Sequence, residues 1–441
     1  MEKIKNYLSG KFDQYEIYSS QSNSKSISFE SNSLKEISSK QSQGTAIRGI
    51  KNYDLTFAST SSTKADNFIK VIEELSGYPI FAPINFPELA KKDIQVQLYS
   101  SDTYEFPNDY LIDQIKLSRD KILKLFPDAL CDSGFNLIES ESKLENSNGL
   151  EIVTKQSYSG FYVSVQIINN KDMLNIYDGS SSSLIINKDQ ITIITEKIIK
   201  YLKLGQKIVD PPKSGCSVVF TPSGLLQSII SPLLVSFNGS NIAKNLSKLT
   251  NKENNKILDE KICIYDNPSI DYSPASKNYD DEGVPSQKFD LIKNGKFISG
   301  YYDLKSSKEA KRQTTGSAGR SINSQPTPTT SNIFMEKGKD KLDNIIKSID
   351  DGILIDSLLG AGQGNELSGD FSANISLGYR IKNGKLIGRI KNTMLSGNAF
   401  DALSKMTELF FLLFSFFFDF FEISVDSCII RSLRFLTILI G

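Results

Sequence analysis

The chain has 441 residues, and its 51 lysines and arginines balance its 51 aspartates and glutamates. This neutral formal charge argues against a nucleic-acid-binding protein that relies on overall positive charge. The chain contains no histidine. Because imidazole is the usual general base near neutral pH and the commonest metal ligand, histidine-based catalytic triads and zinc sites are excluded.

The cysteines are few and widely separated. No two of them have the close spacing of a metal or redox motif, which favours free thiols in a reducing compartment; they are Cys131, Cys216, Cys263 and Cys428. The first residues, MEKIKNYLSGK, are polar and predict no secretory signal. We therefore expect a cytoplasmic protein.

Apolar residues alternate with polar ones through the first 60 residues, which predicts strands, with a hairpin over Thr45–Ser59. Helical spacing follows in three places. We expect one helix capped by Thr63, one capped by Asn108 after Pro107, and one over Lys188–Leu204.

The two prolines in Gln206–Ser214 make this segment the best candidate for a linker. Beyond it the chain is rich in strand patterns, interrupted by expected helices over Gly224–Leu234 and Lys339–Ile349. No regular strand–helix–strand alternation is present. The sequence predicts an α+β fold with largely antiparallel sheets, in two domains that cover residues 1–205 and 206–441.

Four segments contain residues that could take part in binding or catalysis. The glycine-rich run Leu358–Asp370 precedes a strand pattern rather than a helix, which favours a turn over a nucleotide site. Asp280–Gly283 is an acidic cluster that can hold a divalent cation or form an ordinary turn. Thr314–Arg320 and Pro326–Asn332 are poor in apolar residues and can line a peptide or anion site, or form a solvated connection.

Two apolar runs occupy the C-terminal tail, Phe410–Phe421 and Ile429–Ile440. Each is shorter than the roughly 20 residues that span a bilayer, so we expect no membrane segment. The eight phenylalanines of the first run favour a degraded reading frame, and membrane attachment is the alternative. Phe435–Gly441 is a candidate final strand.

Several segments, taken in order, resemble the TldD/PmbA family from about residue 15 to residue 405. They are SLKEISSKQSQGTAIRGIKNYDLTFASTSS (Ser33–Ser62, with the G-x-x-x-R sequence Gly44–Arg48), SGCSVVFTPSGLLQSI, YDDEGVPSQKFDLIKNGKFISGYYDLKSSKEAKRQTTGSAGR, PTPTTSN, GILIDSLLGAGQG, SGDFSANISLGYRIKNGKLIGRI and LSGNAF. The tail after residue 409 departs from the family pattern.

The resemblance implies a cytoplasmic peptidase with two kinds of subunit. The TldD kind carries H-E-x-x-x-H on a helix, which supplies zinc ligands and a general base. The PmbA kind, also called TldE, lacks this motif and pairs with the catalytic kind in a heterodimer. Here the two histidine positions fall on Val235 and Ser240 and the glutamate position on Ser236. The family's cysteine ligand has only Cys428 as a candidate.

The chain therefore resembles a non-catalytic PmbA/TldE-like subunit of a TldD-type metallopeptidase that acts on peptides or unfolded polypeptides. The resemblance implies no cofactor in this chain, zinc only in the TldD-like partner, and no activity of the chain alone. The residues expected to line its cavity are Asp281, Glu282, Gly283, Thr315, Gly316, Ser317 and Arg320. Two alternatives stay open: an enzyme with a metal bound by Asp280, Asp281 and Glu282, and a purely structural homo-oligomer.

Overall fold

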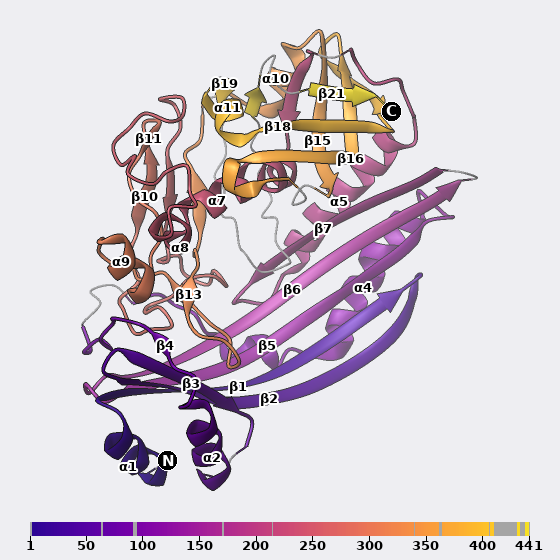
Figure 1. The fold of residues 1–441 in the computed structure, drawn as a ribbon. Coiled ribbons are helices and arrows are strands. Elements are labelled where there is room, and N and C mark those ends of the chain that lie inside the picture. Colours follow the sequence, from indigo (N-terminus) through magenta and orange to yellow (C-terminus); the bar gives the residue numbers. More distant parts are fainter. Residues whose placement is uncertain are drawn as a thin grey trace.

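A seven-stranded antiparallel sheet dominates the N-terminal part of the computed structural model, which describes residues 2–62, 65–90, 95–169, 172–213, 215–338, 340–360, 364–404, 406–409, 430–432 and 437–440. The order is β4-β3-β2-β1-β5-β6-β7 (Figure 1). The expected hairpin is confirmed, because β2 and β3 pair as antiparallel neighbours, with Thr45 opposite Thr60 at one end and Lys51 opposite Asp54 at the other. The strands are β1 (Gln14–Glu30), β2 (Ser33–Lys51), β3 (Asp54–Thr60), β4 (Ile80–Phe81), β5 (Leu130–Asn146), β6 (Glu151–Asn169) and β7 (Asp172–Ser182).

Five helices accompany this sheet: α1 (Glu2–Lys11), α2 (Ala65–Leu75), α3 (Ser101–Tyr104), α4 (Asn108–Leu123) and α5 (Lys188–Gly205). The expected helix at 188 is confirmed and begins at a capping box, in which Asn187 and Gln190 exchange side chain-to-backbone hydrogen bonds of 3.0 Å. Pro107 rather than Asn108 occupies the N-cap of α4. Thr63, the expected cap of α2, lies outside the described residues. Helix α1 was not predicted, since it buries only Ile4 and Leu8.

The C-terminal part contains an eight-stranded mixed sheet, in the order β19-β20-β8-β15-β16-β18-β21 with β17 beside β16. Its strands are β8 (Ser217–Phe220), β15 (Asp351–Leu359), β16 (Asp370–Lys382), β17 (Lys385–Arg389), β18 (Thr393–Asn398), β19 (Met406–Leu409), β20 (Ile430–Ser432) and β21 (Thr437–Ile440). β8 and β15 are parallel, and the other pairs among the described residues are antiparallel. β15 is followed by β16, as expected for a glycine-rich turn between strands.

Two smaller sheets lie between β8 and β15 in sequence. One has the order β11-β10-β9-β14, and the other pairs β12 with β13. Their strands are β9 (Ile264–Asp266), β10 (Phe289–Lys293), β11 (Lys296–Phe297), β12 (Ala318–Gly319), β13 (Thr327–Pro328) and β14 (Ile333–Met335). With the two larger sheets and the short helices, they confirm the α+β fold class.

The C-terminal helices are shorter and more numerous than expected. The helix predicted over Gly224–Leu234 is a succession of α6, a π-helical turn and α7, and the one predicted over Lys339–Ile349 shrinks to α10. Helix α9 was not predicted. The buried Asp303 caps it by accepting hydrogen bonds from the backbone N–H and the hydroxyl of Ser306. The elements are α6 (Pro222–Leu225), η1 (Leu226–Ile230), α7 (Ser231–Phe237), α8 (Gly239–Ala243), α9 (Leu304–Ala310), α10 (Leu342–Lys347), η3 (Glu366–Ser368) and α11 (Ala399–Ser404).

Helix α5 joins the two large sheets through one hydrophobic core. Its Ile194 and Ile198 are fully buried in a cluster that also contains Val219 of β8 and Leu354 of β15. The ring of Tyr201 stacks on that of Tyr379 at 5.4 Å. Because apolar packing continues past residue 205, the domain boundary there stays a prediction.

The C-terminal phenylalanine-rich segment, residues 410–421, lies outside the described residues. No helix in the described part of the chain is both long enough and apolar enough to cross a bilayer. Cys131, Cys216 and Cys263 are free thiols, and Cys428 is not among the described residues.

Candidate functional site: a polar pocket above a buried charge cluster

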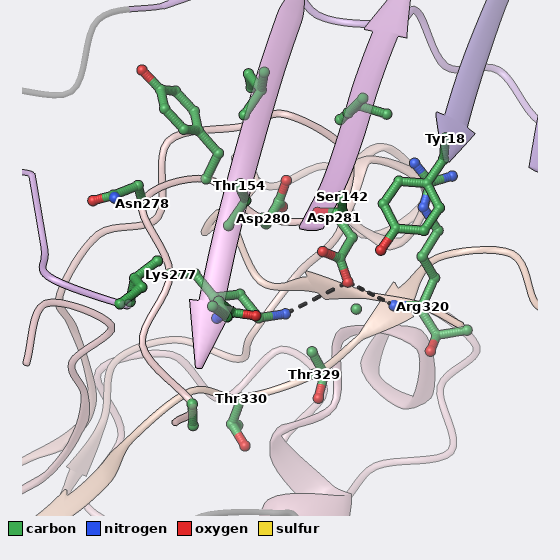
Figure 2. A pocket seen from close by; sticks show the side chains of 18 of the residues that line it. Tyr18, Ser142, Thr154, Lys277, Asn278, Asp280, Asp281, Arg320, Thr329 and Thr330 are labelled. Carbon is green, nitrogen blue, oxygen red and sulfur yellow. Dashed lines mark hydrogen bonds and ion pairs between the residues drawn. The ribbon is translucent and has the colours of Figure 1, made fainter. Parts of the chain in front are cut away.

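A pocket of about 580 Å³ lies between the N-terminal sheet and loops of the C-terminal part. Strands β1, β5 and β6 supply one wall, with Tyr18, Ser142 and Thr154 turned into it (Figure 2). The opposite wall consists of the loop of residues 274–281 and the hairpin of β12 and β13. Such a volume is typical of pockets that bind small ligands.

Asp281 is the acidic group at the centre of this pocket. Its Oδ2 accepts a hydrogen bond of 2.9 Å from the backbone N–H of Arg320 and lies 3.6 Å from Nζ of Lys277 (Figure 2). The side chains of Asp281 and Lys277 both remain 26% exposed. The second carboxylate oxygen of Asp281 accepts no hydrogen bond from a described residue and is available to a ligand.

Four buried charges lie beneath the pocket, and we call them the Glu16 cluster: Glu16, Arg48, Glu282 and Arg320. The guanidinium of Arg48 donates to both oxygens of Glu16, at 3.0 and 2.8 Å, and to Oε1 of Glu282 at 2.7 Å. Arg320 donates to Oε1 of Glu16 at 2.7 Å. All four side chains are at most 3% exposed. The cluster joins strands β1 and β2 to two loops that follow more than 230 residues later.

Arg320 connects the cluster to the pocket. Its guanidinium carbon lies 4.2 Å from the ring centroid of Tyr18, a cation–π contact, while Nε and Nη2 have no hydrogen-bond partner among the described residues. Burial, followed by the negative charge of Asp281, raises the pKa of Tyr18. Tyr18 therefore presents a neutral hydroxyl to the pocket at physiological pH.

The acidic turn divides its carboxylates among three different roles. Asp280 is buried and accepts hydrogen bonds from the backbone N–H groups of Glu282, Val284 and Ala318, at 2.9 to 3.1 Å. Glu282 pairs with Arg48 and accepts from the N–H of Leu304 at 2.7 Å. Asp280 and Asp281 both border the pocket, but of the three carboxylates only Asp281 is partly exposed in it. This divergence gives no support to a metal shared by the three carboxylates.

Two loops near the pocket, the acidic turn of residues 280–283 and the loop that contains residue 316, each depend on a glycine. Gly283 has φ +84°, and a Cβ there would come within 2.5 Å of Leu150. Gly316 has φ +65°, and its Cβ would meet the carbonyl oxygen of Pro285 at 2.6 Å. Glycine therefore allows each loop to pack closely against its neighbour.

The residues expected to line a cavity are brought to one region, but in different positions. Asp281 and Arg320 border the pocket. Glu282 belongs to the Glu16 cluster, and Gly283 packs beside it in the turn. Behind the pocket wall, the hydroxyl of Thr315 accepts from the N–H of Tyr302, while Gly316 and Ser317 border a void of about 10 Å³.

The positions of the family zinc motif do not fit a zinc ion. The backbone leaves the helical conformation at Asn238, between α7 and α8, so the motif positions are split between two helices. Val235 has no side-chain atom that could bind a metal, and the hydroxyl of Ser236 is buried and points toward the carbonyl of Leu367. Ser240 is the second residue of α8. Zinc is held by imidazole, thiolate or carboxylate groups, and none of these positions offers one.

Several pocket residues were not found from the sequence. Tyr18, Ser142 and Thr154 lie on three adjacent strands, β1, β5 and β6, respectively. Thr154 of β6 is the direct cross-strand partner of Ser142 of β5. No local signal distinguishes such residues from other half-buried strand positions. Thr327, Thr329 and Thr330 belong to the segment Pro326–Asn332, which had been singled out for its hydroxyl groups.

The sequence and the fold of this chain are both similar to those of PmbA/TldD proteins. The PmbA/TldA metallopeptidase domain 1 matches residues 15–76, and the PmbA/TldA metallopeptidase C-terminal domain matches residues 213–412. An uncharacterized protein of Methanocaldococcus jannaschii is 28% identical over 61% of this chain and 61% of its own length. A metalloprotease TldD homolog of Buchnera aphidicola is 38% identical over 37% of this chain and 34% of its own length.

Both curated relatives are thus matched over less than two thirds of their length. The crystal structure of TldE from Thermococcus kodakarensis superposes with a TM-score of 0.86 at 24% identity and covers 99% of both chains. This likeness shows a shared fold.

Replacement of Arg48 by methionine is expected to lower the free energy of unfolding by about 3–5 kcal/mol, because Glu16 and Glu282 would stay buried without their cation. Urea denaturation measures the change. Lys155→Ala is the control: it removes an exposed ion pair with Glu141 and should cost less than about 1 kcal/mol. Similar losses in the two variants would contradict the assigned role of the cluster.

Stability should depend on pH through Asp280. Burial and the nearby charge of Glu282 raise the pKa of Asp280 from 3.8 to about 8. A carboxyl group that holds its proton more tightly in the folded state stabilises fully below pH 3.8, and this contribution is lost as the pH rises toward about 8. We expect the pH dependence of the unfolding free energy to be shallower in Asp280→Asn. The exposed Asp54→Asn is the control, and equal slopes in wild type and Asp280→Asn would refute the assignment.

Proposed function

Because the chain belongs to the PmbA/TldD metallopeptidase family, we propose that it is a non-catalytic subunit of the PmbA kind. In this proposal it binds peptides for a TldD-like catalytic partner in the cytoplasm. The observation that carries the proposal is a polar pocket in a chain whose zinc-motif positions hold no zinc ligand.

The catalytic step belongs to the partner. In the family motif, two histidines bind the zinc and a glutamate takes a proton from the zinc-bound water. Valine and serine at these positions can perform neither task, and the chain has no histidine elsewhere. The contribution of this subunit is therefore to bind and orient the peptide.

The chemistry of the pocket suits a peptide. Hydroxyl groups of Ser142, Thr154 and Thr329 can exchange hydrogen bonds with backbone amides of a ligand. Asp281 and Lys277 place one negative and one positive charge on the same wall. An amide-rich chain with charged termini or side chains can satisfy both.

The proposed partner binds through the C-terminal, strand-rich part of the chain. Permanent pairs of this type usually bury more than about 2,000 Å². The TldD-type relatives and the TldE-like fold support the pairing of two related subunits.

Co-expression with a TldD-like protein that carries H-E-x-x-x-H tests the complex. We expect one peak in size-exclusion chromatography, with zinc and peptide hydrolysis in the complex. The isolated chain should contain no stoichiometric zinc and hydrolyse no peptide. Separate elution of the two proteins at micromolar concentration would reject the pairing, and about one zinc per isolated chain would reject the non-catalytic role.

Thr154→Trp should fill the pocket from strand β6, where an aromatic residue suits the backbone. We expect kcat/KM of the assembled complex for peptides to fall at least about tenfold, or about 1.4 kcal/mol in the activation free energy. The neighbouring Val153 is 54% exposed and points to the opposite face of the same strand, so Val153→Trp is the matched control. Unchanged turnover in a stable Thr154→Trp complex would show that the pocket does not bind the substrate.

A further inference from the structure

Strand β2 has a long sheet edge that no described part of the chain covers. β3 pairs with β2 only from Thr45 to Lys51, whereas β1 pairs with β2 along its whole length. Residues 33–43 are exposed, except for the half-buried Ser38. Figure 1 shows no element beside this outer part of β2. Its backbone N–H and C=O groups on that side form a template for another strand.

Two opposite charges on this edge have no ion-pair partner among the residues that the structure describes. Glu36 lies opposite Ser28 of β1, and Lys40 lies opposite Ser24. Neither charge takes part in an ion pair among the described residues, whereas Lys35 is paired with Glu30. Glu36 and Lys40 are four residues apart and therefore point to the same face of the strand.

A second copy can pair with this edge in only a few antiparallel registers. In an antiparallel pair, directly opposed side chains point to the same face of the sheet. Residues of the two identical strands that oppose each other are therefore an even number of positions apart, and the two-fold axis passes through a residue of β2 and not between two residues. An axis through residue 36 or 40 brings like charges together, and an axis through 37 or 39 leaves both charges opposite uncharged or apolar residues. An axis through Ser38 places Glu36 of each copy opposite Lys40 of the other.

The length of the free edge selects the same axis. β3 leaves residues 33–44 of β2 uncovered, and an axis at residue 38 pairs residues 33–43 of the two copies, so only Gly44 of this segment stays unpaired. The bulge opposite Ser28 and Phe29 interrupts the pairing only near Lys35. Residues 36–40, which contain both charge pairs, keep the regular alternation of a strand.

We propose that two copies of this chain associate through their β2 edges, antiparallel and about a two-fold axis at Ser38, to form one continuous sheet. Edge lysines normally discourage such pairing. Here each lysine meets a glutamate, so the charges select one register instead of preventing association. The proposal does not rest on the peptidase role, because it concerns the N-terminal sheet and leaves the C-terminal part free for another partner.

Charge reversal tests the proposal on the full chain. Glu36→Lys and Lys40→Glu each turn both cross-strand pairs into like-charge pairs and should weaken self-association roughly tenfold or more. The double variant Glu36→Lys/Lys40→Glu restores opposite charges and should regain wild-type association. An equimolar mixture of the two single variants should form a mixed dimer more tightly than either variant associates with itself.

Sedimentation equilibrium from micromolar to millimolar concentration measures each association, and circular dichroism confirms that these exposed substitutions leave the fold intact. A wild-type chain that stays monomeric overturns the proposal, as does one whose edge binds an extended peptide instead. Dimers that are indifferent to the single reversals, or a double variant that fails to recover, would show that another surface is used.

Discussion

Arg48 is the group on which the arrangement of the two parts of the chain depends. Its guanidinium lies between Glu16 of the N-terminal sheet and Glu282 of a distant loop, and none of the three is more than 3% exposed. A buried charge without a partner costs several kcal/mol. A small separation of the sheet from the loop would leave such charges buried, so the two either remain in contact or separate far enough for water to hydrate the charges. The pocket inherits this constraint, since Tyr18 and Asp281 each stand within two residues of a cluster member.

The same geometry explains why neighbouring acidic residues have different properties. Asp280 points into a nest of backbone N–H groups, Glu282 toward a guanidinium, and Asp281 toward open space. The directions of these three side chains follow from the backbone conformation of the turn, which requires the positive φ of Gly283. Three adjacent carboxylates thus serve the loop, the connection between the two parts and the pocket, respectively, which distinguishes this turn from a cation-binding loop.

The sequence indicated elements with strong local signals and missed those that depend on distant contacts. The helical spacing of apolar residues in Lys188–Leu204 and the alternation in Thr45–Ser59 predicted correct elements, because both patterns depend on neighbours along the chain. Helix α9 was missed because its cap, Asp303, is stabilised by burial. Asp281 and Arg320 were named from family motifs, but their relation to Tyr18 arises only when β1 packs beside residues some 300 positions later.

Strand β6 serves two purposes along its 19 residues. Near its start Thr154 borders the pocket, and farther along Phe161, Val163 and Val165 are buried in the core shared with α5. The pleat assigns even positions to one face and odd positions to the other. Insertion or deletion of a single residue between Gln156 and Phe161 would therefore exchange the two faces in one half of the strand. Sequence drift in this stretch is thus restricted to substitutions, and changes of length have to occur in the flanking turns.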